Sequence, residues 1–215
     1  MMAKGGSFER EVAKQLSLWW TGAKRDDVFY RSHSSGARFT QRRKAGKDTA
    51  LQAGDLTCSD PIGEPLIRIW NIECKTGYGG KGKIRDTEGE VMKIPVKQNG
   101  KIIKYIDKTT TIRWDILDIL DSHQKEPVII KMWKQCLRDS TLSNRTPVLI
   151  FRRNARSSCI MIGELYFTKL QSWLGNYSGF SCGIRGIGRG IGIIMPTKTF
   201  LEWAINLPEI IKTTL

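Results

Sequence analysis

The chain has 215 residues, 40% hydrophobic and 26% charged, which is the composition of a folded domain that can bury a core. It contains no uncharged apolar run of about eighteen residues, so we expect no membrane span, and its first residues lack the apolar stretch of a secretory signal. The net charge of +14, from 35 Lys and Arg against 21 Asp and Glu, indicates a polyanionic partner.

The five cysteines are scattered along the chain and form no Cys-x-x-Cys pair. This spacing argues against a disulfide framework and against a structural zinc site. Buried, reduced thiols in a cytoplasmic protein are the simplest interpretation.

The N-terminal quarter of the chain predicts a helix, a strand and a basic loop. Residues 7–20 predict the helix because apolar side chains recur every three or four residues, with Ser7 as the N-cap and Gly22 as the stop. A short strand is expected at 28–31. The polar stretch 32–53 predicts a long loop or a short helix between loops, and it holds a basic cluster of Arg38, Arg42, Arg43, Lys44 and Lys47.

Two further strands follow, joined by a turn rich in Pro and Gly. The first starts at Asp55 and ends near Ser59, and the second is an Ile-rich run over 66–75. After a basic glycine turn at 77–83, the charged stretch 84–111 predicts a hairpin around Asn99-Gly100.

The rest of the chain alternates strand and helix patterns. The sequence GIRGIGRGIG within 181–192 lacks the Gly-x-G-x-x-Gly spacing of a dinucleotide-binding loop, so we interpret it as a loop or a Gly-rich strand. The expected elements are a helix from Pro127 through Leu137, strands at 147–152 and 158–162, and helices at 167–174 and 197–205.

The informative chemistry lies in Asp55, Glu73 and Lys75. Side chains two apart on a strand point the same way, so Glu73 and Lys75 share a face. If the two strands form a hairpin, Asp55 can lie across from Glu73. Two such carboxylates make an oxygen site for Mg²⁺, beside which Lys75 can orient a water or stabilise developing negative charge.

Other interpretations of these residues stay open at this point. Alternating charges on a strand also occur on ordinary surfaces, and the basic chain is compatible with a non-catalytic nucleic-acid-binding protein whose acids are only structural. Charge alone does not separate DNA from RNA as the partner.

The Asp…Glu-x-Lys pattern resembles the PD-(D/E)XK nuclease superfamily, with Gly54 where many members have proline. Within it, KGGSFEREVAKQL (4–16) resembles the opening helix of archaeal-type Holliday junction resolvases, whose Glu joins the metal site. By position that residue is Glu9, with Glu11 as the competing acid. RSHSSGAR (31–38) resembles their loop beside the cleaved strand.

The resemblance implies a Mg²⁺-dependent endodeoxyribonuclease, with Mn²⁺ able to substitute, that cleaves branched DNA as a homodimer in the cytoplasm, or in the host cytoplasm if the chain is viral. A restriction-type endonuclease or an exonuclease of the same fold is the alternative. The implied catalytic residues are Glu9, Asp55, Glu73 and Lys75, the first three being metal ligands. Gln135 resembles a Gln of related nucleases, and His33 could assist from the basic loop. The expected DNA-binding residues are Arg31, Ser34, Ser35, Arg38, Arg42, Arg43, Lys44, Lys47, Lys81 and Lys83.

We therefore expect an α/β fold in which a mixed central sheet is flanked by helices, like the core of restriction endonucleases. Residues 1–152 are the predicted nuclease core, with an inserted segment at about 78–125, and 153–215 are a C-terminal extension packed on it. Both additions go beyond a small resolvase. They could bind another DNA form, a partner protein or a second subunit.

Overall fold

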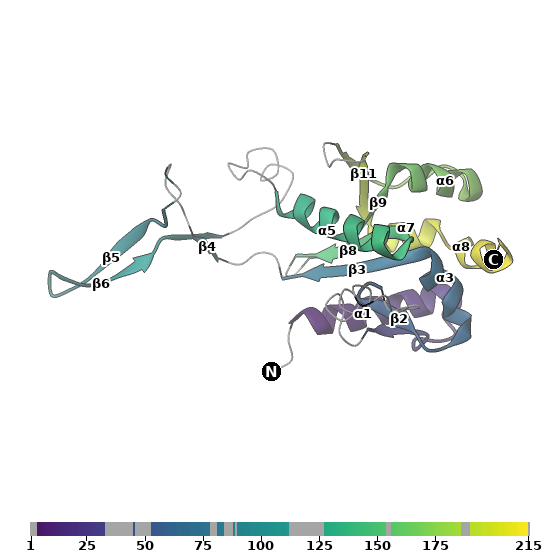
Figure 1. The fold of residues 1–215 in the computed structure, drawn as a ribbon, viewed down its shortest axis with the longest axis horizontal. Coiled ribbons are helices and arrows are strands. Elements are labelled where there is room, and N and C mark those ends of the chain that lie inside the picture. The colour runs from purple at the N-terminus through teal and green to yellow at the C-terminus, as the bar shows by residue number, and fades with distance from the viewer. Residues whose placement is uncertain are drawn as a thin grey trace.

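A computed structural model describes residues 4–32, 45, 53–77, 81–83, 88, 90–111, 127–153, 156–185 and 190–214. Its centre is a five-stranded sheet in the order β10-β11-β9-β8-β3 (Figure 1). Strands β3 and β8 are parallel, and the other neighbours are antiparallel. This confirms the expected α/β class with a mixed sheet. The strands are β3 (Trp70–Thr76), β8 (Thr146–Arg152), β9 (Cys159–Gly163), β10 (Cys182–Ile184) and β11 (Gly192–Pro196).

Helices cover both faces of this sheet, because its strands are apolar on both sides. Strand β8 shows the alternation: Val148 and Ile150 join the core that contains α1 (Lys4–Trp20), whereas Leu149 and Phe151 join the core under α5 (Val128–Ser143). Figure 1 shows α1 and α5 on opposite sides of β3. Helices α6 (Glu164–Leu174), α7 (Thr197–Trp203) and α8 (Leu207–Thr214) contribute to the α1 core. Within the described ranges, no helix has the length and apolar character needed to cross a membrane.

The predicted strand over 66–75 is only half right. Residues Glu64–Ile69 form helix α3, and β3 begins at Trp70. Pro65 lies in the first helical turn, where its missing N–H is tolerated, and Arg68 pairs with Glu64 one turn away at 2.8 Å. An apolar run this short does not distinguish the two structures by periodicity.

The expected hairpin between the Asp55 strand and the Glu73 strand is therefore wrong. The connection consists of a 3-10 turn, η1 (Pro61–Gly63), followed by α3. Strand β2 (Leu56–Cys58) pairs antiparallel with β1 (Phe29–Arg31) in a small sheet of its own. Within the described residues α1 begins at Lys4, so Ser7 lies inside the helix and the predicted N-cap is wrong.

The segment 153–215 shares the central sheet with the rest of the chain. It supplies β9, β10 and β11, and the glycine-rich stretch contributes to the last two of these strands. Helix α8, which the sequence reasoning did not predict, buries Leu207 and Ile211 against α1's side of the sheet.

The inserted segment contains the predicted hairpin. Strands β5 (Lys93–Gln98) and β6 (Lys101–Asp107) pair around Asn99 and Gly100, whose φ angles of 51° and 76° suit the two-residue hairpin turn for which Asn-Gly is preferred. Figure 1 shows this hairpin extending away from the body of the protein. At its base β4 (Lys81–Lys83) pairs with β7 (Thr109–Thr111).

Candidate active site

Strand β3 carries Glu73 and Lys75 on the face that α5 covers, as the two-residue spacing predicts. The ammonium of Lys75 pairs with Oε1 of Glu73. The amide Nε2 of Gln135, on α5, donates a hydrogen bond to the same oxygen at 3.1 Å. Glu73 is only 4% exposed, while Cys74 between the two lies in the α1 core. The structure therefore brings Glu73, Lys75 and Gln135 together.

Asp55 reaches the free edge of β3 from the loop before β2. Its backbone amide donates to the carbonyl of Ile72 at 2.8 Å, and its Oδ2 accepts a hydrogen bond from the amide of Cys74, also at 2.8 Å. Gly54 makes this approach possible, since its φ of +83° is unfavourable for other residues and a Cβ there would lie 2.6 Å from the Ile72 oxygen. The carboxylate of Asp55 thus lies beside the strand that carries Glu73.

The carboxyl groups of Asp55 and Glu73 are buried. Burial, and then the negative charge of Asp55, raise the pKa of Glu73 to about 7, against the opposing effect of Lys75. Burial also raises the pKa of Asp139, which lies one turn beyond Gln135 on α5, and the nearby Gln135 side chain opposes that shift. Lys75 and Asp55 are close enough to influence Asp139.

This donor set fits a hard divalent cation. Asp55 and Glu73 are two buried carboxylates, and the charge of Asp55 contributes to the raised pKa of Glu73. A cation between them would favour the ionised form of Glu73. In the described part of the chain, no group of three or more His, Cys, Asp and Glu side chains gathers as a metal centre. Two carboxylates suffice for Mg²⁺, which usually completes its shell with waters and phosphate oxygens.

Glu9 lies on α1 near the same edge of the sheet. It is 8% exposed and pairs with Arg31 of β1, so two predicted site residues contact each other. Burial raises the pKa of the Cys74 thiol, and the charges of Asp55, Glu73 and then Glu9 add to this shift. The role of Glu9 as a metal ligand stays a prediction. The competing acid Glu11 pairs with Arg152 at 2.5 Å instead.

Of the remaining predicted DNA-binding residues, only some lie in the part of the chain that the structure describes. Lys81 and Lys83 lie on the short strand β4. His33 and the other predicted DNA-binding residues fall outside the described part of the chain, namely Ser34, Ser35, Arg38, Arg42, Arg43, Lys44 and Lys47.

Sequence reasoning missed Asp139. Its signal is its place four residues after Gln135, which puts both side chains on one face of α5. That spacing means little until Gln135 is known to face Glu73.

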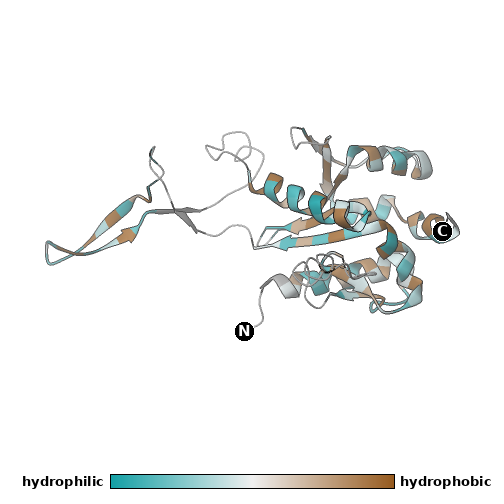
Figure 2. Ribbon diagram, in the orientation of Figure 1, coloured by the Kyte–Doolittle hydropathy of each residue, from teal (hydrophilic) through white to brown (hydrophobic). Residues whose placement is uncertain are grey.

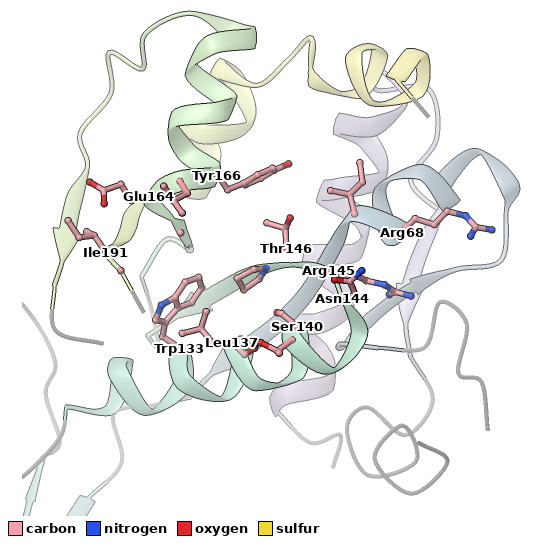
Figure 3. Close-up of a pocket in the computed structure, with 16 residues that line it drawn as sticks. Arg68, Trp133, Leu137, Ser140, Asn144, Arg145, Thr146, Glu164, Tyr166 and Ile191 are labelled. Atoms are coloured by element: carbon pink, nitrogen blue, oxygen red, sulfur yellow. Dashed lines mark hydrogen bonds between the residues drawn. The ribbon is translucent and has the colours of Figure 1, made fainter. Parts of the chain in front are cut away.

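A cavity of about 750 Å³ lies elsewhere on the molecule, between α5, α6 and the loop before β11. Figure 3 shows Arg68 and Arg145 at one end of it and Glu164 and Ile191 at the other. Asp55, Glu73 and Lys75 are not among its lining residues. The carboxylate site is therefore separate from this cavity.

Comparison with known proteins found a similarity in the N-terminal part of the chain. Residues 2–91 match a family model described as "Phage putative PDDEXK endonuclease". The matched segment contains α1, Asp55, Glu73 and Lys75, so this N-terminal part of the chain is similar to that family. No curated protein and no solved structure matches the chain.

Proposed function

We propose that the chain is a Mg²⁺-dependent endonuclease that hydrolyses phosphodiester bonds of DNA, with branched DNA as its preferred substrate. The observation that carries the proposal is the meeting of Asp55, Glu73 and Lys75 at one edge of the sheet, although Asp55 comes from the loop before β2. The similarity to a family described as an endonuclease supports the same reaction.

In this mechanism Asp55 and Glu73 hold the metal ion, and Glu9 supports it from α1. The ion, when bound, lowers the pKa of a coordinated water and neutralises charge on the phosphate. Lys75 is the cation that positions the attacking water or stabilises the developing charge. Gln135, by donating to Oε1 of Glu73, fixes the orientation of that carboxylate.

The proposed substrate, branched DNA, is inferred from the net charge of the chain and from its resemblance to junction resolvases. A net charge of +14 favours a polyanion, and contacts to phosphates would give salt-sensitive affinity. The preference for branched DNA rests on the resemblance of residues 4–16 to junction resolvases. Two symmetric cuts in a junction suit a homodimer, acting in the host cytoplasm.

Cleavage assays separate this proposal from its alternatives. We expect the wild type to cut DNA with Mg²⁺ or Mn²⁺, and Asp55→Ala to lose this activity. The exposed Asp26 provides the matched control Asp26→Ala, which should cut like the wild type. Equal activity of wild type and Asp55→Ala would show that this site does not carry the cleavage. No cleavage with any divalent metal would leave a non-catalytic nucleic-acid-binding protein.

A substrate panel then tests the finer claim. Four-way junctions, linear duplexes and RNA are compared at matched salt. Preferential, paired nicking of the junction supports the resolvase type. Equal cutting of linear duplex favours the restriction type, and release of mononucleotides from ends favours an exonuclease.

A further inference from the structure

The hairpin of β5 and β6 exposes several large apolar side chains. The two strands form a sheet of their own, and a two-stranded hairpin without further packing is only marginally stable in water. Yet Ile94 is 43% exposed, Ile103 55% and Tyr105 61%. Clustered exposure of this kind marks a contact surface.

The register divides the hairpin into an apolar base and a basic tip. Opposite residues share a face, so Ile94 with Ile106 lies on one face and Pro95 with Tyr105 on the other. Toward the turn the pairs become Lys97 with Ile102 and Gln98 with Lys101. Figure 2 shows the hydrophilic tip and the hydrophobic patches nearer the base.

The charge of the hairpin indicates which kind of partner this surface binds. The hairpin carries exposed lysines at 93, 97, 101 and 104 against the single acid Asp107. A second copy of this basic chain would bring like charges together, whereas a phosphate backbone would neutralise them. The shape also suits DNA, because the major groove, about 12 Å wide, admits a two-stranded ribbon.

We propose that the β5–β6 hairpin is a DNA-binding arm that enters the major groove beside the cleaved strand, with Lys97 and Lys101 on phosphates and the face of Ile94 and Ile106 against base edges. The inference rests on the proposed action on DNA. It assigns the inserted segment to substrate binding and not to catalysis.

The test measures binding of the full-length protein to labelled linear duplex in EDTA, over a series of salt concentrations. The arm variant is Lys97→Glu with Lys101→Glu. The control, Lys24→Glu with Lys198→Glu, makes the same charge change at exposed positions of the body. We expect the arm variant to bind about tenfold or more weakly and to lose roughly two from the slope of log K against log salt. Equal weakening by both variants would overturn the arm, since net charge alone would explain it.

A second variant tests the apolar base. Ile94→Ser with Ile106→Ser, on one face of the hairpin, should weaken binding while leaving the salt slope unchanged. Sedimentation without DNA gives the opposing outcome: a fall in the mass of the assembly in this variant would assign the surface to a second copy of the chain and overturn the proposal.

The arm and the proposed function fail differently. A wild type that binds through the arm but does not cut with Mg²⁺ contradicts the nuclease and leaves the arm standing. A wild type that cuts, with an arm variant that binds like the control, contradicts the arm alone.

Discussion

The side chain of Asp55 accepts a hydrogen bond from the backbone amide of Cys74, the residue between Glu73 and Lys75, at 2.8 Å. This bond uses an unpaired amide at the edge of β3 to fix the position of a carboxylate. It explains how Asp55 can join Glu73 although β2 and β3 belong to different sheets. Two hydrogen bonds therefore hold Asp55 against β3. Its side chain accepts one from the Cys74 amide, and its backbone amide donates the other to the Ile72 carbonyl.

Gly54 should be essential to that approach. We expect Gly54→Ala to lower the free energy of unfolding by about 2 kcal/mol or more and to reduce cleavage, because the new Cβ would meet the Ile72 carbonyl. Gly175→Ala is the matched control: its φ is also +83°, but nothing lies within 4 Å of its Cβ position. Urea unfolding measures both. Equal losses would show that the left-handed φ alone carries the cost.

Gln135 should act through Glu73. Replacing it with leucine removes the donor to Oε1 at similar volume, and loss of a hydrogen bond to a charged group, about 1.5 kcal/mol, corresponds to roughly tenfold. We expect kcat to fall by that factor with KM for DNA unchanged. Gln171→Leu on α6 serves as the control. A Gln135→Leu enzyme with unaltered kcat would remove this residue from the site.

The metal-free protein should lose stability as the pH rises. Glu73 has a folded-state pKa of about 7, above its ordinary value of 4.5, so the folded state holds the proton more tightly. The contribution of Glu73 to the unfolding free energy should therefore be greatest below pH 4.5 and fall by roughly 2–3 kcal/mol by pH 7.

Glu73→Gln, which cannot ionise, should flatten this profile and be the more stable protein at pH 8. Urea unfolding in EDTA at pH 5 and pH 8 measures the difference between the two proteins. Parallel profiles would mean that Glu73 is not the group responsible.

Glu9 and Arg31 allow the metal and structural roles to be separated. If Glu9 supports the metal, Glu9→Gln should raise the Mg²⁺ concentration needed for half-maximal cleavage by about tenfold. Arg31→Gln, which breaks the same ion pair from the other side, should leave that concentration nearly unchanged. The same small loss of stability in both, with no change in metal dependence, would confine Glu9 to pairing with Arg31.

The sequence predicted the relative placement of Glu73 and Lys75 because strand geometry is local. The two-residue spacing of Glu73 and Lys75 was enough to place them on one face, and the Asn99-Gly100 signal predicted its hairpin correctly. The α/β class also followed from the order of elements.

The sequence-based predictions failed at residues whose structure depends on tertiary packing. Leu66 and Ile67 look like strand residues but are buried in a short helix started by Pro65. The approach of Asp55 depends on Gly54 and on the edge of β3, neither of which has a sequence signal. Asp139 gained meaning only once α5 was seen to cover Glu73.

The central claim is that Asp55 and Glu73 together hold a divalent cation, and a crystal of the protein soaked in Mn²⁺ tests it most directly. We expect an anomalous peak within about 2.2 Å of a carboxylate oxygen of each residue, with Lys75 beside it. A well-ordered crystal with no peak between them, and Lys75 still paired with Glu73, would contradict it.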